Sequence, residues 1–147
     1  MTTGADIVRV AREWIGTRWR HQAAQRGVGT DCVGLLVGVA YELGLGDARA
    51  ESRDVDFNGY GRAPDPSLLL RAANHYLEPA AWPEVGGVLL MRFAANPQHF
   101  AIISQVSPLP YIIHAYAQAR KVVENRVDTV WRQRIVRYYR FPGVTDG

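Results

Sequence analysis

The spacing of apolar residues changes once along this 147-residue chain, and the change constrains the fold class. Up to about residue 77, apolar side chains recur at the three- and four-residue spacing of helices that bury one face or more. After Glu78-Pro79, which is expected to form a turn, the chain divides into short runs rich in β-branched and aromatic residues, separated by Gly, Pro or Asn. Helices followed by a series of strands predict an α+β domain with an antiparallel sheet.

Three helices are expected before the change. The second is apolar on nearly every face, which is typical of a buried helix, and Thr30 or Asp31 offers a side-chain oxygen to cap it. The third follows Asp65-Pro66-Ser67, with Pro66 suited to a first turn. The expected ranges are 4–15, 31 to about 44, and 68–77; residues 16–30 and 47–63 are expected to be irregular.

Five strands and one short helix are expected after the change. The strands are Val85–Phe93, Phe100–Val106, Tyr111–Tyr116, Lys121–Glu124 and Ile135–Phe141, and residues 127–134 have helical spacing. A hairpin centred near Ser107 would bring residues 113–115 opposite His99. Because the chain has no internal repeat and no linker, residues 1–147 are expected to form one domain.

Composition excludes several classes of protein. The single cysteine excludes an internal disulfide, which favours synthesis in a reducing cytoplasm. No basic region followed by an apolar run opens the sequence, so no signal peptide is expected, and no apolar run reaches the ~18 residues of a membrane span. The net charge of +3 permits an anionic partner such as nucleic acid or cell wall, but the excess is small and spread along the chain, so it is weak evidence for one. No phosphate-binding glycine motif or zinc-ligand spacing is present, and no cofactor is expected.

Cys32 falls in the first turn of the expected buried helix. Free backbone N–H groups and the helix dipole favour a thiolate there, but by only about 0.3–1 kcal/mol, or ~2 kcal/mol when partly buried. One pKa unit corresponds to ~1.36 kcal/mol. A thiol that must ionise near neutral pH therefore needs a second cation, usually a histidine.

Two of the four histidines could supply that partner. His21 lies in an irregular segment and His75 within the third helix, whereas His99 opens a strand and His114 interrupts an apolar strand, where a polar residue needs a partner. Two histidines on neighbouring strands suit a base oriented by a third group. A lone cysteine is often an inert buried hydrophobe and a strand histidine is often structural, so spacing leaves both interpretations open.

Four segments taken in order resemble the successive motifs of the NlpC-type (NlpC/p-sixty) cell-wall cysteine peptidases. They are Asp31-Cys32-Val33-Gly34-Leu35, Gly87-Val88-Leu89-Leu90-Met91, Gln98-His99-Phe100-Ala101-Ile102 and Ile113-His114-Ala115-Tyr116. Gly16 to Gln22 and Trp131 to Pro142 are similar to the branch found in phage tails and gene transfer agents. The resemblance covers nearly the whole chain and is weakest over residues 47–80.

The resemblance implies a papain-like fold, with the nucleophile at a helix N-terminus packed on an antiparallel sheet. Cys32 would be the nucleophile, His99 the general base and acid, and His114 the polar third member. Backbone N–H groups near Cys32 would form part of an oxyanion hole. Trp19 stands where the family often has a tyrosine, and it is left out of the catalytic set.

The implied activity is a peptidoglycan stem-peptide endopeptidase that cleaves between D-glutamate and the diamino acid. The implied setting is a phage-like tail, contacting tail-tip, baseplate or hub proteins and opening the recipient's cell wall for DNA entry. Two other functions stay open. One is a structural plug or adaptor with weak or lost catalysis; the other is DNA binding by the arginine-rich C-terminal segment, which strand alternation would divide between two faces.

Overall fold

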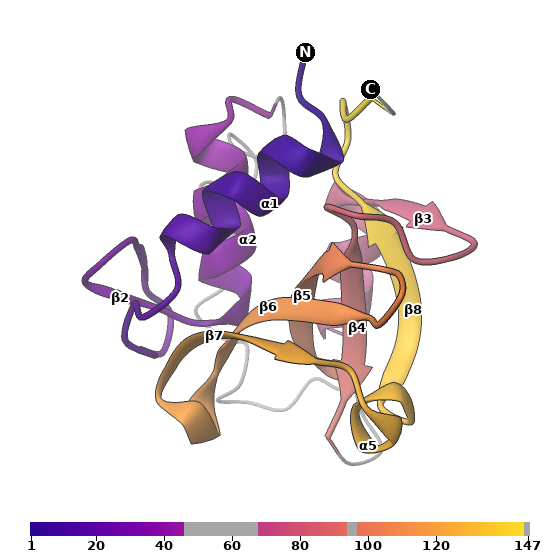
Figure 1. Cartoon of the computed structure of the whole chain (residues 1–147). Helices are drawn as coiled ribbons and strands as arrows, with labels where there is room; N and C mark the ends of the chain where they lie inside the picture. Colours follow the sequence, from indigo (N-terminus) through magenta and orange to yellow (C-terminus); the bar gives the residue numbers. More distant parts are fainter. Residues whose placement is uncertain (46–67, 94–96, 146–147) are drawn as a thin grey trace.

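The computed structural model describes residues 1–45, 68–93 and 97–145 as two layers, helices against a sheet (Figure 1). Helices α1 (Gly4–Glu13), α2 (Cys32–Glu42) and α4 (Leu68–Tyr76) pack against a six-stranded antiparallel sheet. The predicted α+β class and the helix-then-strand order are therefore confirmed. The second helix, expected to end at about residue 44, ends at Glu42 with Leu43 as its C-cap. The start predicted for the third helix at Asp65-Pro66-Ser67 and the irregular segment 47–63 lie outside the described residues.

The large sheet has the strand order β3-β8-β4-β5-β6-β7. Its strands are β3 (Glu78–Ala80), β4 (Val88–Arg92), β5 (Pro97–Gln105), β6 (Tyr111–Tyr116), β7 (Lys121–Arg126) and β8 (Ile135–Arg140). A 3-10 turn, η2 (Ala117–Ala119), joins β6 to β7, and the short helix α5 (Thr129–Arg132) precedes β8, close to its predicted position.

Two sequence predictions are wrong. Glu78-Pro79 is not a turn but part of β3, whose partner β8 lies some 60 residues further along the chain (Glu78 pairs with Arg140). The segment 16–30 is not wholly irregular, because β1 (Ala24–Gln25) and β2 (Gly29–Thr30) form a small antiparallel sheet that precedes α2 in the chain and contacts it. The pairing of β3 depends on a partner that is distant in the sequence, and β1 and β2 are two residues long, too short to show an apolar period. Neither pairing could therefore be predicted from the local sequence.

Helix α2 lies between α1, α4 and the sheet, which explains why it is apolar on nearly every face. Where it crosses α1, a Cβ on Gly38 would lie 2.2 Å from the ring of Trp14, so this position admits only glycine without rearrangement. The main core fills the space between helices and sheet, and a smaller apolar cluster covers the other face of the sheet. Among the described helices, none combines the length and apolar character that crossing a bilayer requires.

Candidate active site

Cys32 is the first residue of α2, as predicted, and Asp31 is the N-cap. The Asp31 carboxylate accepts hydrogen bonds from the Gly34 amide at 2.9 Å and the Gln22 amide at 2.6 Å. It therefore fixes both the start of the helix and the loop that leads to it. A Cβ on Gly34 would lie 1.9 Å from the Ala23 carbonyl oxygen, so glycine lets the loop pass close to the helix.

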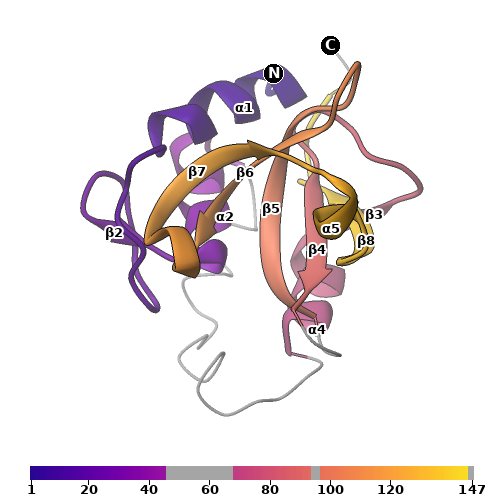
Figure 2. The same ribbon diagram turned by 60° about the horizontal axis from the view of Figure 1, so that its bottom comes forward.

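The thiol of Cys32 lies where β5 and β6 separate. Their paired register ends at Ile102 opposite Ile113, and α2 contacts both strands (Figures 1 and 2). Ile103 donates its N–H to the Gly87 carbonyl on the β4 side. Since N–H direction alternates along a strand, that of Phe100 points to the β6 side, where it faces the sulfur of Cys32. The sulfur thus sits beside the residue that follows His99.

The two strand histidines are hydrogen-bonded to each other and to a third side chain. His99 Nε2 lies 2.7 Å from His114 Nδ1, and His114 Nε2 lies 2.6 Å from Asn125 Oδ1 on β7. The predicted facing of His99 and residues 113–115 is inexact, because extending the Ile102–Ile113 register by three residues sets His99 level with Tyr116. His114 is therefore a diagonal neighbour of His99, and strand alternation places both on one face.

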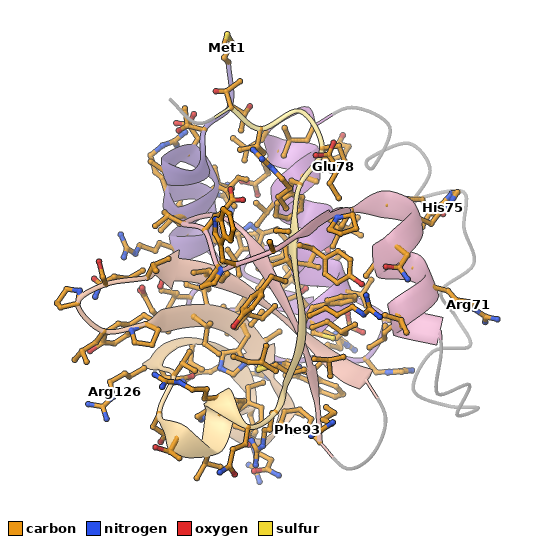
Figure 3. All side chains as sticks on the ribbon, turned by 90° about the vertical axis from the view of Figure 1, so that its right-hand side faces the viewer. Met1, Arg71, His75, Glu78, Phe93 and Arg126 are labelled. Carbon is orange, nitrogen blue, oxygen red and sulfur yellow. The ribbon has the colours of Figure 1, made fainter. Side chains whose placement is uncertain are left out.

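Aromatic side chains enclose the histidine pair. Phe93 lies 5.1 Å from His99 between ring centroids, Trp131 lies 5.1 Å from His114, and Tyr116 stacks on His114 at 5.3 Å. Figure 3 shows Phe93 at the end of the molecule where α5 lies, remote from Met1. Only 4% of His99 and none of His114 is exposed. Water has little access to the imidazoles in this conformation.

Arg134 closes this enclosure by stacking. Its guanidinium carbon lies 4.8 Å from the Phe93 ring centre and 4.7 Å from that of Trp131. Arg140, from the same C-terminal segment, instead contacts Glu84 and the Val144 carbonyl. These two arginines are engaged in different parts of the fold, and they do not form a shared basic surface.

Burial controls the protonation of all three groups. Desolvation, followed by the Asp31 charge, raises the pKa of the Cys32 thiol to about 12. Desolvation, with smaller effects from His114 and Arg134, lowers the pKa of His99 well below its usual value, and desolvation lowers the pKa of His114 to about 4. The helix terminus does not offset these effects. These shifts favour a thiol and a neutral imidazole over a thiolate–imidazolium pair at neutral pH.

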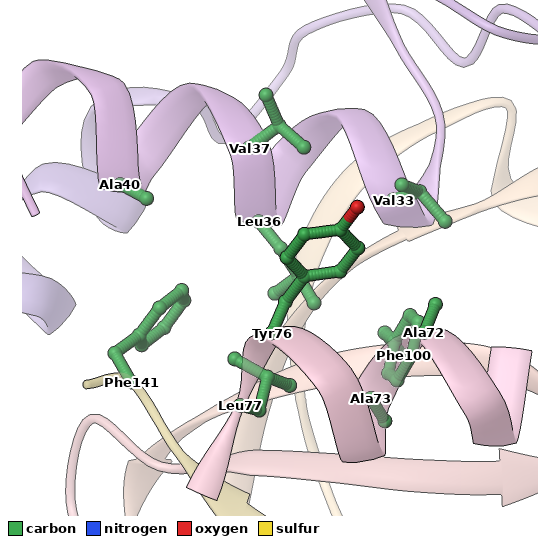
Figure 4. A pocket seen from close by; sticks show the side chains of 10 residues that line it. All are labelled: Val33, Leu36, Val37, Ala40, Ala72, Ala73, Tyr76, Leu77, Phe100 and Phe141. Atoms are coloured by element: carbon green, nitrogen blue, oxygen red, sulfur yellow. The ribbon is translucent and has the colours of Figure 1, made fainter. Parts of the chain in front are cut away.

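An apolar pocket lies directly beside this site. It has a volume of about 50 Å³ between α2 and α4, where Tyr76 extends towards α2 (Figure 4). Val33 and Phe100, which follow Cys32 and His99 in the chain, are among its lining residues. The first turn of α2, which carries Cys32, and the start of β5, which carries His99, are thus both flanked by apolar side chains.

Among the solved structures that are similar to this chain are three of low sequence identity. The NlpC/p60 domain of the peptidoglycan hydrolase SagA aligns with 94% of this chain and 98% of its own at a TM-score of 0.62 and 18% identity. The chain has the fold of an NlpC/p60 domain. A Staphylococcus aureus lipoprotein-like protein of the NLP/P60 family gives a TM-score of 0.63 at 14% identity, covering 94% of this chain but only 41% of that protein.

The third similarity is to an N-acetylmuramoyl-L-alanine amidase from Bacteroides uniformis. It has a TM-score of 0.55 and 14% identity, and it covers 92% of this chain and 96% of the amidase. Comparisons of the sequence with protein-family models and with curated proteins give no match. The NlpC/p60 fold is therefore established by structure.

Trp19 and the two other histidines lie outside the hydrogen-bonded chain. Trp19 is partly buried, pairs through its backbone with Thr30, and lines an open pocket of about 450 Å³ with Arg18, Ala117 and Arg120. The ring of His21 lies 6.4 Å from that of Trp19, and its charge acts on Asp31. His75 is exposed on α4. None of these three has a hydrogen bond to His99 or His114 among the described contacts.

Sequence analysis did not single out Asn125. Its proximity to His114 follows from the β6–β7 register, in which His114 faces Val123 and Ile112 faces Asn125, so Asn125 is the diagonal neighbour of His114. Pairing the predicted strands 111–116 and 121–124 as a hairpin would have indicated it. Within the described ranges, no three His, Cys, Asp or Glu side chains cluster as metal ligands would.

Proposed function

We propose that this chain is a peptidoglycan hydrolase that cleaves an amide of the stem peptide through a covalent thioester on Cys32. The observation that carries the proposal is that the Cys32 thiol and the His99–His114 pair both lie at the fork between β5 and β6. The thiol lies beside the Phe100 amide, and the adjacent His99 is hydrogen-bonded to His114. A nucleophile, a base and a group orienting the base are the parts that acyl transfer requires.

The protonation states determine the order of events. Because the thiol is protonated at rest, it must lose its proton to His99 as sulfur attacks the scissile carbonyl carbon. The C–N bond then breaks, and His99 returns the proton to the leaving amine. Water attacks the thioester, giving one proton to His99; the carboxylic acid leaves and Cys32 recovers its thiol. This sequence calls for no metal or organic cofactor.

Backbone amides are the proposed stabilisers of the oxyanion. Cys32 begins α2, so the N–H groups of the first turn point away from the helix body and have no partner within it. Asp31 already accepts from the Gly34 amide, which leaves those of Cys32 and Val33 directed at the sulfur region. Donors at this position would face the carbonyl oxygen once sulfur bonds to its carbon.

The bond between D-glutamate and the diamino acid is the proposed cleavage point, on the basis of the motif resemblance to stem-peptide endopeptidases. The muramoyl–alanine amide is the competing bond, suggested by the fold of the Bacteroides amidase. The phage-like tail, with tail-tip or baseplate neighbours and action on the recipient's wall, likewise belongs to the proposal through the motif resemblance.

A structural plug is the second candidate function, and burial favours it. Only 8% of Cys32 and 4% of His99 is exposed, and the thiol pKa is raised. A domain in this closed form would hold its fold in a particle without turning over substrate. The two functions differ in whether purified protein releases fragments from peptidoglycan.

Mass spectrometry of muropeptides treated with wild type, Cys32→Ala and the matched control His75→Gln separates them. We expect wild type and His75→Gln to release the same new amine-terminated fragments, and Cys32→Ala to release none. The fragment masses identify the bond. Equal release by Cys32→Ala would refute the cysteine mechanism, and no release by any of the three would favour the plug.

A further inference from the structure

The side-chain amide of Asn125 is held in one orientation. Its Nδ2 donates to the backbone carbonyl of Arg126 at 3.0 Å, which directs Oδ1 to the other side, towards His114. The reverse orientation would place an N–H donor where Oδ1 now lies and a lone pair against the Arg126 carbonyl. An amide oxygen can only accept hydrogen bonds, so the nitrogen it contacts must carry a proton.

That requirement passes along the hydrogen-bonded chain. With Nε2 protonated and the ring neutral, His114 Nδ1 holds a lone pair and must accept. His99 Nε2, 2.7 Å from that nitrogen, must then be the donor. A neutral ring carries one proton, so Nδ1 of His99 has a free lone pair. Nδ1 is also the ring nitrogen nearer to the β5 backbone, beside which the sulfur of Cys32 lies.

We propose that Asn125 is a positioning residue that fixes both imidazoles as Nε2–H tautomers and thereby leaves His99 Nδ1 as the base. Its effect on catalysis rests on the proposed hydrolase function, whereas its effect on the tautomers does not. The opposite tautomer of His114 would set its Nε2 lone pair against Oδ1, and two N–H groups would also meet between the rings unless His99 changed its tautomer as well. Such a residue acts through His114 and touches neither sulfur nor substrate.

The magnitude follows from the chemistry of orienting groups. In serine proteases, an orienting group that holds histidine in the wrong tautomer lowers kcat by about 10⁴. Deleting an acceptor permits the wrong tautomer without imposing it. A neutral hydrogen bond of ordinary net strength then corresponds to a loss in kcat of about 10-fold. Since Asn125 is remote from the substrate, KM should change little.

The test compares Asn125→Leu, which removes the acceptor, with Asn125→Asp, which keeps one. Asn74→Leu is the control, because Asn74 Oδ1 accepts from the Tyr139 hydroxyl on another part of the fold. Two-bond ¹H–¹⁵N spectra at about pH 7, where both buried rings are neutral, report which ring nitrogen carries the proton. Steady-state hydrolysis of a purified muropeptide is measured in parallel.

In wild type, Asn125→Asp and Asn74→Leu, we expect protonated Nε2 and unprotonated Nδ1 signals for both histidines. In Asn125→Leu, we expect His114 to shift towards the other tautomer and kcat to fall about 10-fold with KM nearly unchanged. Unaltered ring-nitrogen shifts in Asn125→Leu would overturn the proposal, as would Nδ1–H in the wild type. A wild type with Nε2–H rings and no hydrolysis would refute the proposed function alone. If Asn125→Leu fails to fold, Asn125→Asp and the wild-type tautomers still decide it.

Discussion

Asp31→Ala tests how the nucleophile is positioned. Asp31 is 2% exposed and accepts two backbone hydrogen bonds, one from the first turn of α2 and one from the preceding loop. Losing an N-cap costs about 1 kcal/mol. Leaving a second donor without its acceptor costs a further ~1–3 kcal/mol, towards the lower end because Gln22 is only half-buried.

Relief of an unfavourable charge reduces that cost. Burial raises the pKa of Asp31 despite its amide donors, so the folded protein holds this carboxylate at an electrostatic disadvantage. We therefore expect a net loss of about 2 kcal/mol in the free energy of unfolding, measured by urea at about pH 7. Asp128→Ala is the matched control. Asp128 caps α5 through a single bond to the Trp131 amide and is exposed, so its loss should cost about 0.5–1 kcal/mol.

The same substitution should make the thiol more reactive. The Asp31 charge raises the pKa of Cys32, so removing it lowers that pKa and speeds alkylation by iodoacetamide between about pH 7 and pH 9. Asp31→Asn separates charge from capping, because the amide oxygen still accepts from Gly34. We expect Asp31→Asn to react faster with less loss of stability. Equal stability of Asp31→Ala and Asp128→Ala, or unchanged alkylation in both Asp31 variants, would refute the reasoning.

Two further predictions concern stability. Below about pH 6.5 His114 becomes protonated in the unfolded chain, whereas in the folded chain it stays neutral until about pH 4. The free energy of unfolding should therefore fall by about 3 kcal/mol between these pH values. Urea unfolding of His114→Gln should show a smaller fall, and an equal fall would contradict this prediction. Gly38→Ala should lower the free energy of unfolding by about 1–2 kcal/mol, because the clash of a Cβ 2.2 Å from the Trp14 ring outweighs the better helix propensity of alanine. In a double-mutant cycle, Trp14→Phe should restore part of the lost stability. Strictly additive losses would show that residues 38 and 14 do not interact.

The parts of the fold that were predictable depend on local chemistry. The buried helix and its start at Asp31 follow from a capping side chain before an uninterrupted apolar run, and the structure confirms them. The hairpin near Ser107 brought His99 and His114 to the same region because a short connection between strands favours antiparallel pairing. A register error of one or two residues remained, since apolar alternation here is too weak to fix the pairing.

The parts that were not predictable depend on distant partners and on burial. Strand β3 forms because its backbone pairs with β8, and nothing within Glu78-Pro79-Ala80 indicates that pairing. Asn125 gains its significance only from the register that brings it to His114. The raised pKa of Cys32 likewise follows from enclosure by α2, β5 and β6, whereas the sequence shows only the favourable helix end.

The two ends of the described chain lie side by side. The Thr145 amide donates to the Thr2 carbonyl at 2.9 Å, and Thr3 and Thr145 form a parallel bridge at the top of the molecule, away from α5 (Figure 1). Adjacent ends allow a domain to be inserted as one cassette into a surface loop of a host protein. They also allow circular permutation, with a short linker closing the ends and a new opening at the exposed tip near Leu109. In that permuted chain the strands of His99 and His114 would enter the fold from opposite ends.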